Sequence, residues 1–241
     1  MLKQSLCLLS IVFLFSCKKD NSNVPVITTG KITGSVTLYN ERSNTLSSSE
    51  GMTVSIDGTI LSTVTNASGS YQFENIPNDI YNLTFSKPGF GTFKLFGFSH
   101  TGTGNNSSIV PGKSLGQLST TTIVSQSATL RGDSVQISAT ISPAATSAAR
   151  RGVRIFFDNS AAVSSSTYKN FSQVYFTSNV PSVLFSKEDL YAMGFAAGST
   201  VYARVYGDSF FANDYEEVST GATVFPNLNT NSSAAVSFTL P

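Results

Sequence analysis

Few side chains of this sequence have types and spacings that suit catalysis or metal binding. The single histidine, His100, lies in a run rich in Gly, Ser, Thr and Asn (residues 99–108). This run predicts a solvated loop, whereas a Ser-His-Asp triad needs a held imidazole. Asp208 and Asp214 are common turn residues, their spacing does not match a calcium loop, and no opposed pair in a cleft is evident. We therefore predict no enzymatic activity, no metal and no cofactor.

The cysteines lie near the N-terminus, at Cys7 and Cys17. Cys7 belongs to a ten-residue apolar run, Leu6–Phe15, that follows Lys3. A membrane-spanning helix needs about 20 apolar residues, so this run is typical of a secretory signal peptide over residues 1–16. After its removal Cys17 is the only cysteine left, and no disulfide or thiolate metal site is expected.

The residues Leu14-Phe15-Ser16-Cys17 resemble the lipobox of bacterial lipoproteins. The resemblance implies cleavage before Cys17, acylation of that cysteine with palmitate and other chains, and attachment to the cell outer membrane. Residues 17–29, polar and without periodicity, then read as a lipidated flexible linker. A cleaved signal peptide that leaves Cys17 as a free thiol is the alternative. The Cys-Lys-Lys-Asp start is similar to lipoproteins of the Bacteroidetes and leaves open whether the protein is surface-exposed.

The composition argues against nucleic acid as a partner. The chain has 15 Lys and Arg against 14 Asp and Glu, and one of the bases, Lys3, lies in the signal peptide. Arg150, Arg151 and Arg154 are too few to follow a phosphate backbone. Charged residues make up 12% of the chain. Abundant Ser, Thr, Asn and Gly among β-branched and aromatic residues predict an all-β exported protein.

Residues 30–119 predict a first β-sandwich. Alternating apolar residues begin at Ile32, and Asp57-Gly58 has the chemistry of a hairpin turn. Residues 30–36, 52–56, 63–73 and 76–90 resemble the carboxypeptidase-regulatory-like domain, a transthyretin-like family. Asn66 stands where that family usually has Asp, and both can cap the same turn. The resemblance implies a small, non-catalytic sandwich.

Residues 120–241 predict a second sandwich in tandem with the first. Ser186 and Asp189 have capping-box spacing and predict a short helical turn. Residues 198–206 resemble strand F of fibronectin type III and immunoglobulin-like domains, with Tyr202 as the candidate corner tyrosine. The strand is expected to end near Gly207 and the next to begin near Val218.

Two aromatic groups are candidate ligand-binding residues. Phe210, Phe211 and Tyr215 are expected in a loop at the end of the second sandwich, where binding sites commonly lie. They could also close the end of the sandwich or pack on the first one. Phe96 and Phe98 are expected to share a strand face with Lys94 and to cover an inter-module contact.

These features predict a lipid-anchored protein of the cell envelope. Its expected role is that of a non-catalytic binding or scaffolding accessory. The alternative is a carbohydrate-binding surface lipoprotein of a glycan-uptake system. The expected partners are the membrane, through Cys17, and a glycan or envelope protein.

Overall fold

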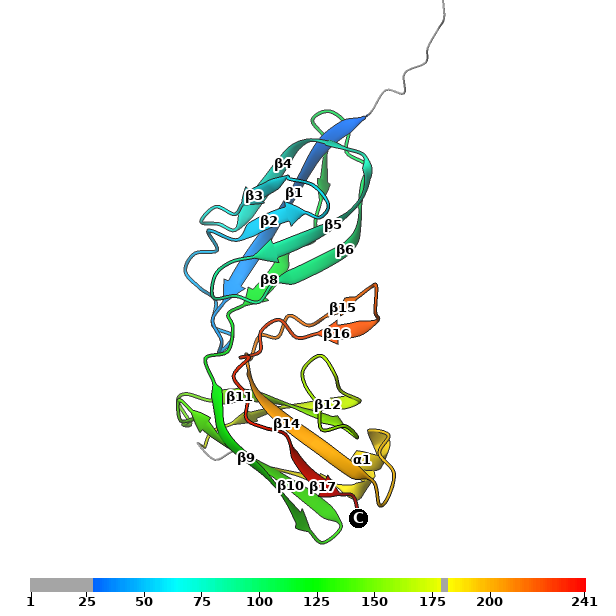
Figure 1. Cartoon of the computed structure of the whole chain (residues 1–241). Helices are drawn as coiled ribbons and strands as arrows, with labels where there is room; N and C mark the ends of the chain where they lie inside the picture. Colours follow the sequence, from blue (N-terminus) through cyan, green and yellow to red (C-terminus); the bar gives the residue numbers. More distant parts are fainter. Residues whose placement is uncertain (1–27, 179–181) are drawn as a thin grey trace, which may run out of the picture.

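The computed structural model of the chain describes residues 28–178 and 182–241. Within these residues it contains seventeen strands and one short helix, which confirms the all-β fold with tandem β-sandwiches. The strands form a first lobe, β1 to β8, on the side of the N-terminus and a second lobe, β9 to β17 (Figure 1). No helix of the described residues is long and apolar enough to cross a membrane.

The first lobe is made of two facing sheets. One has the order β4-β1-β7, with β8 also pairing to β1, and the other the order β3-β2-β5-β6. The long strand β1 pairs in parallel with β7 through residues 31–33 and with β8 through residues 36–39. The bounds are β1 Thr29–Tyr39, β2 Thr53–Ile56, β3 Ser62–Val64, β4 Ser70–Pro77, β5 Asp79–Ser86, β6 Phe93–His100, β7 Ser107–Ile109 and β8 Lys113–Gly116.

Alternation along most of each strand places the apolar residues of this lobe between its sheets. On β4 the buried side chains include Tyr71 and Phe73, and on β5 they include Leu83 and Phe85. A period of two puts alternate residues on one face of a strand, as the sequence predicted here. The predicted hairpin at Asp57-Gly58 also forms, between β2 and β3, although its turn extends over residues 57–61.

The second lobe also has two facing sheets. Their orders are β13-β10-β9 and β12-β11-β14-β17, and β15 and β16 form a separate hairpin. The bounds are β9 Thr122–Arg131, β10 Ser134–Ser142, β11 Arg151–Asp158, β12 Asn170–Phe176, β13 Ser182–Ser186, α1 Lys187–Ala192, β14 Thr200–Asp208, β15 Tyr215–Glu217, β16 Ala222–Val224 and β17 Val236–Thr239. The capping box of α1, in which Ser186 and Asp189 bond each other's backbone N–H groups, is confirmed.

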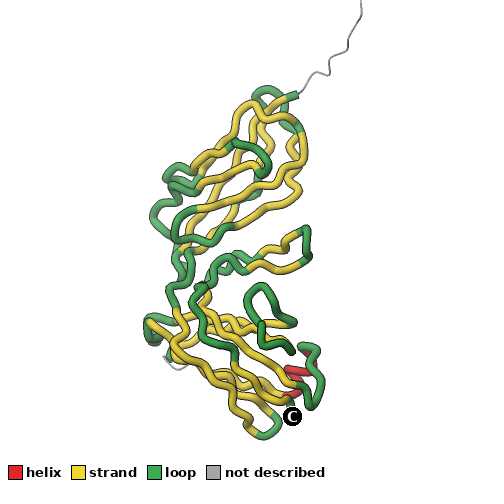
Figure 2. The backbone as a smooth tube through the Cα atoms, in the orientation of Figure 1, coloured by secondary structure: helices red, strands yellow, loops and turns green. Residues whose placement is uncertain are grey.

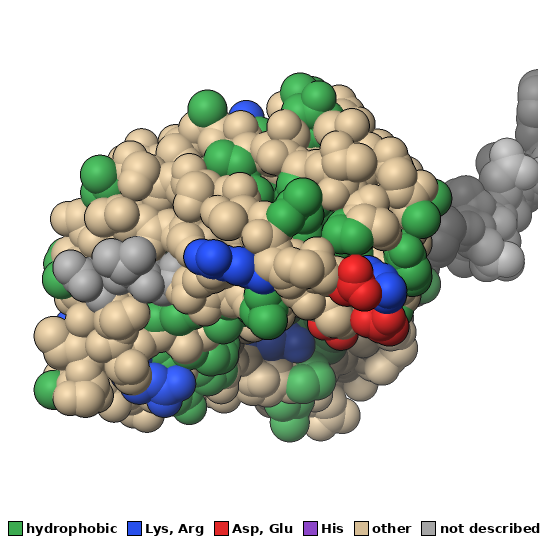
Figure 3. Space-filling model, turned by 90° about the horizontal axis from the view of Figure 1, so that it is seen from below, with side chains coloured by type: hydrophobic (Ala, Val, Ile, Leu, Met, Phe, Trp, Pro, Cys, Tyr) green, Lys and Arg blue, Asp and Glu red, His purple; other side chains and the backbone are tan. Residues whose placement is uncertain are grey.

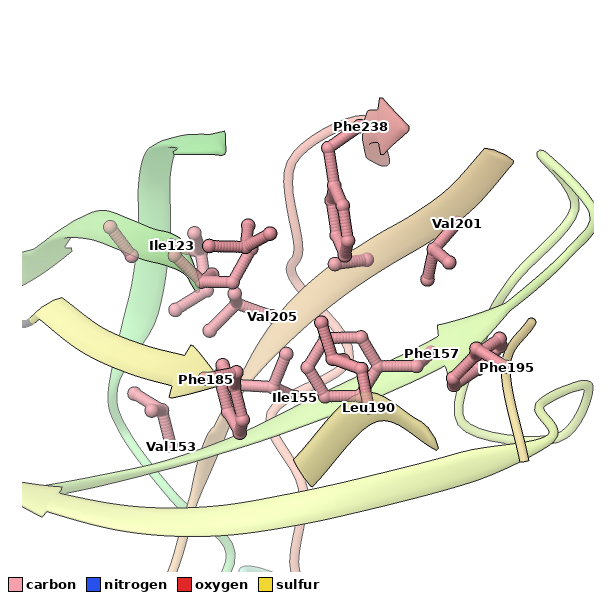
Figure 4. Close-up of a cluster of buried hydrophobic side chains, with 14 of the residues drawn as sticks. Ile123, Val153, Ile155, Phe157, Phe185, Leu190, Phe195, Val201, Val205 and Phe238 are labelled. Atoms are coloured by element: carbon pink, nitrogen blue, oxygen red, sulfur yellow. The ribbon is translucent and has the colours of Figure 1, made fainter. Parts of the chain in front are cut away.

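The core between these sheets is aliphatic and aromatic (Figure 4). Phe157 of β11 meets Phe185 of β13 edge to face, with ring centroids 5.1 Å apart. Leu190 of α1 and Phe195 close the cluster next to them. The helix thus contributes its one buried residue, Leu190, to the sandwich core.

A third cluster covers the outer face of the sheet β12-β11-β14-β17. Phe156, next to Phe157 on β11, points to this face and is as fully buried as its neighbour. Phe225 and Leu228, which follow β16, pack over it. One strand therefore carries buried aromatic residues on both faces, which the alternation rule alone does not predict.

The smooth backbone trace shows the hairpin β15–β16 lying between the lobes (Figure 2). The face at the far end of the second lobe carries mainly uncharged side chains and backbone, with charged side chains in small groups (Figure 3). A broad basic surface is not present on that face.

Candidate functional site

The segment between β14 and β17, residues 209–235, holds the hairpin β15–β16 and is called the insert below. Sequence patterns placed the next strand near Val218, but Val218 lies in the turn of this hairpin, and the strand that returns to the sheet begins at Val236. The insert leaves the second lobe and reaches the first lobe. It therefore decides which predicted aromatic residues meet.

Tyr215 of β15 lies against the first lobe. Its ring centroid is 5.7 Å from that of Phe93 and 6.2 Å from that of Phe96, both on β6. Two aromatic groups that are more than a hundred residues apart in sequence are thus neighbours. Beside them a groove of about 630 Å³ opens between the lobes, lined by Asn82, Phe96, Gly97, Glu217, Val218 and Ser219. We call it the inter-lobe groove.

The lining of the inter-lobe groove is mostly apolar, with a few polar groups at its edges. Val218 is 69% exposed and Phe96 is half-buried. The Asn82 side-chain oxygen accepts the Gly97 N–H at 2.9 Å, which leaves the two amide hydrogens of Asn82 as donors. Such a combination of apolar surface and a few polar groups suits ligand binding.

The charges near the groove do not form a catalytic pair. Glu217 is the only carboxylate among its described lining residues. Lys94 lies 6.0 Å from the centre of the Phe96 ring, and its Nζ is 3.8 Å from a carboxylate oxygen of Asp57. Burial, together with Glu217 and Asp57, raises the pKa of Tyr215, which keeps its hydroxyl protonated as a donor. This chemistry supports binding.

The prediction that Phe96 and Phe98 share a face is wrong. Gly97, at φ +66°, lies in an irregularity of the β5–β6 pairing. After this bulge Phe98 faces inward and packs on the core of the first lobe, whereas Phe96 faces outward to the groove. A bulge inserts one residue and so reverses the alternation of a strand.

Phe210 and Phe211 lie at the start of the insert and are both half-buried. Phe211 stacks on Tyr39 at the end of β1, with centroids 4.3 Å apart and planes 10° apart. Phe210 stacks instead on Tyr175 of β12, also at 4.3 Å. Contact of Phe211 with the first lobe agrees with the packing alternative, and a ligand-binding role for either residue stays a prediction.

An ion pair joins the lobes next to these rings. The guanidinium of Arg151 on β11 lies 2.7 Å from a carboxylate oxygen of Glu41, which follows β1. Thr120, in the connection between the lobes, donates its N–H and its hydroxyl to the same carboxylate. The Glu41 backbone carbonyl accepts the Phe210 N–H at 2.8 Å. One residue of the first lobe thus holds both β11 and the insert.

Two asparagines of the insert bind the backbone of β8 and its continuation. Asn213 accepts the Gly116 N–H at 2.7 Å and donates to the Ser114 carbonyl at 2.6 Å. Asn227 donates to the Gly116 carbonyl at 2.7 Å. Both asparagines are buried. Sequence patterns did not indicate these contacts, because Asn in a polar segment usually indicates a turn.

A buried arginine lies beneath the insert. Arg154, with 2% of its side chain exposed, bonds Asp208 through Nε and Asp214 through Nη1, each at 2.9 Å. Its guanidinium lies over the rings of Phe225, at 4.4 Å, and Phe171, at 5.2 Å. Burial raises the pKa of both carboxyl groups, although the Arg154 guanidinium acts in the opposite direction, and the charge of Asp208 raises the pKa of Asp214 further. This network is structural, as it lies under the third cluster.

The prediction of a solvated His100 is wrong. His100 ends β6, where it pairs with Asp79 of β5, and it is 1% exposed. Its Nε2 lies 3.1 Å from the Ile76 carbonyl oxygen. Gly102 makes room for the ring, because a Cβ there would lie 2.7 Å from the imidazole. The residue is therefore part of the packing of the first lobe.

Some sequence predictions lie outside the site. Cys17 is outside the described residues, so its lipidation stays a prediction. Tyr202 is half-buried and packs against the third cluster. Across residues 28–178 and 182–241, no group of three or more His, Cys, Asp and Glu side chains could hold a metal ion.

A family model matches part of this chain. The carboxypeptidase regulatory-like domain matches residues 31–109. The match spans β1 to β7 and confirms the resemblance found in the sequence for this part of the chain. No curated protein matches the chain.

Several solved structures are similar to it over most of its length. A candidate carbohydrate-binding protein from Bacteroides uniformis shares 13% identity, with 88% of this chain and 100% of that chain covered, at a TM-score of 0.34. A DUF3823 family protein from Parabacteroides merdae also shares 13% identity, with coverage of 88% and 99% and a TM-score of 0.32. At these identities and TM-scores the likeness says nothing about what this chain binds.

Proposed function

We propose that this protein is a non-catalytic binding and scaffolding module, held at the cell outer membrane by lipid on Cys17. The observation that carries the proposal is the inter-lobe groove, to which Phe96 of the first lobe and Val218 of the insert both contribute. Ligand sites occur preferentially where two domains meet. The groove has apolar walls and edge donors and lacks an opposed carboxylate pair among its described residues.

Contacts elsewhere between the lobes support a fixed site. The Glu41–Arg151 pair and the asparagines of the insert join the lobes through side chains that are mostly buried. A groove whose walls are held in place loses little conformational entropy when a ligand binds. Binding by a preformed surface therefore fits this arrangement.

A carbohydrate is the ligand class that the groove favours. A sugar ring presents C–H groups that contact apolar and aromatic surface, and hydroxyls that bond amides and carboxylates. Phe96 and Val218 offer the first kind of surface, and Asn82 and Glu217 the second. An envelope protein as the partner is the alternative, and it would use the same exposed Val218.

A glycan array on the full chain in detergent tests the ligand class. We expect binding that Phe96→Ala weakens at least tenfold. The matched control is Ile109→Ala, which changes an exposed apolar residue on the other sheet of the first lobe. Binding that is unaffected by Phe96→Ala, or absent from the array, contradicts the sugar site as placed here.

The anchor is tested separately. Cells that express the chain are labelled with radioactive palmitate and fractionated. We expect label in the protein and its recovery in the outer membrane, both lost in Cys17→Ser. Unlabelled wild-type protein in the soluble fraction contradicts the lipid anchor. This outcome does not bear on ligand binding in the inter-lobe groove.

A further inference from the structure

The buried Arg154 shows how this fold holds a carboxylate. Two aromatic rings lie against its guanidinium, and its N–H groups bond Asp208 and Asp214. Stacking on rings leaves the in-plane donors of a guanidinium free to grip an anion side-on. The aromatic contacts also fix the orientation of the donors.

Arg150 also lies against two aromatic rings, here at the surface and beside a stacked pair. Its guanidinium carbon lies 5.3 Å from the centre of the Phe210 ring and 5.9 Å from that of Tyr175, and these two rings are stacked on each other. Arg150 is exposed, as is 37% of Tyr175. Among the described residues, no carboxylate forms an ion pair with Arg150. Arg151 and Arg154, its neighbours on β11, are both paired.

Backbone contacts hold the stacked pair of Phe210 and Tyr175 in place. The Phe210 N–H bonds the Glu41 carbonyl, and a Cβ at Gly152 would lie 3.3 Å from the Tyr175 ring. Burial raises the pKa of Tyr175, and Asp208 and Asp214 act in the same direction, whereas Arg154 and Arg150 lower it. Arg150 and the exposed part of Tyr175 thus border one patch of surface.

We propose that Arg150, Tyr175 and Phe210 form a second ligand site, which binds the carboxylate of an acidic sugar. The carboxylate would take the side-on donors of Arg150, as Asp208 does with Arg154, and the sugar ring would lie on the exposed part of Tyr175. The choice of a sugar rests on the proposed function, whereas the choice of a carboxylate rests on the geometry alone.

The site should act by direct contact rather than by a long-range field. Three arginines, at 150, 151 and 154, lie near three acids, Glu41, Asp208 and Asp214, so the cluster has no net charge. Exposed ion pairs are weak in water and are screened by salt. We therefore expect a dissociation constant in the millimolar range, sensitive to ionic strength.

Saturation-transfer NMR on the full chain in detergent tests this site. The probes are methyl β-glucuronoside, methyl β-glucoside and acetylated glutamate amide, each titrated at low salt. We expect the glucuronoside to bind about three- to fivefold more tightly than the glucoside. Arg150→Gln should remove that difference, and Arg150→Lys should restore only part of it.

The matched control is Arg131→Gln, since Arg131 is also exposed and bonds only Gln136. Equal binding of the two sugars, an effect of Arg131→Gln as large as that of Arg150→Gln, or a preference for the glutamate probe overturns the proposal. Phe96→Ala should leave the preference for the glucuronoside over the glucoside unchanged, because that preference depends on Arg150. A failure at Arg150 is thereby distinguished from a failure of the inter-lobe groove.

Discussion

Arg151 of the second lobe and Glu41 of the first lobe form an ion pair with a separation of 2.7 Å, and both side chains are largely buried. The pair lies beside the connection between the lobes, where Thr120 adds two further bonds to the same carboxylate. A charge that is removed from water in this way must keep its partner. The orientation of the lobes therefore depends on residues 110 positions apart in sequence.

The substitution Glu41→Gln should destabilise the junction between the lobes. Hydrogen bonds to charged groups contribute about 2 kcal/mol, and the variant leaves Arg151 buried without its counter-charge. We expect a loss of that size in the free energy of unfolding by urea, and a broader distribution of lobe orientations in small-angle scattering. As a control, Asp133→Asn breaks an exposed pair with Lys187 and should cost under about 0.5 kcal/mol. Equal losses in the two variants would contradict the role given to Glu41.

The substitution Gly116→Ala should separate the insert from β8. A Cβ at this position would lie 2.4 Å from the Phe211 carbonyl oxygen, so the backbone of one segment has to move. We expect loss of the Asn213 and Asn227 contacts, seen as faster hydrogen exchange at the backbone amide of residue 116. At Gly112 a Cβ would come no closer than 3.2 Å, to the Ser35 hydroxyl oxygen, and Gly112→Ala is the control. Unchanged exchange in the Gly116 variant would show that the insert tolerates displacement.

A double-mutant cycle on Tyr39 and Phe211 should reveal direct coupling. Stacked aromatic pairs contribute about 1 kcal/mol beyond the area that they bury. We expect Tyr39→Ala and Phe211→Ala to be non-additive by about this amount in the free energy of unfolding. The cycle Tyr39 with Phe195 joins residues in separate lobes and cores and should be additive. If the effects of Tyr39→Ala and Phe211→Ala on the free energy of unfolding are additive, the stack is not an energetic contact between the lobes.

The pH dependence of stability should carry a contribution from Asp214. Its pKa is raised from the ordinary value of 3.8, so the folded protein keeps a proton that the unfolded chain has released. This contribution to the free energy of unfolding is complete below pH 3.8 and is lost as the pH rises through the raised pKa.

Urea unfolding of the wild type and of Asp214→Asn between pH 3.5 and 7 measures this effect. The amide of the variant resembles the protonated acid, so the stability of the wild type should fall relative to the variant as the pH rises. The opposite slope would mean that attraction to Arg154 outweighs burial and that the pKa of Asp214 is lowered.

Local patterns in the sequence predicted the elements whose structure depends on residues close together in the chain. The alternation around Tyr71 and Leu83 located β4 and β5, and the Ser186–Asp189 spacing located α1. Local patterns gave wrong predictions where contact with a distant segment determines whether a side chain is buried. His100 is buried by contact with Ile76, and Phe98 is turned inward by the bulge at Gly97.

The candidate site was predictable only in its parts. Composition singled out Phe96 and Tyr215, but their meeting depends on a path of the insert that hydrogen bonds to the first lobe fix. Phe156 shows the same limit, since its burial requires Phe225, about seventy residues later. Sequence spacing holds no information on such pairs.

The insert also imposes an order on folding. Domains generally fold as units, and the core cluster of the first lobe contains no side chain of residues 209–235, so this lobe can fold before the insert docks. The backbone of Ser114 and Gly116 is then already in place when Asn213 arrives, and the first lobe serves as a template for it. The second lobe gains its third cluster only as the same segment docks. We therefore expect the second lobe to complete its packing after the first, with the N-terminal lobe as the surface on which the insert docks.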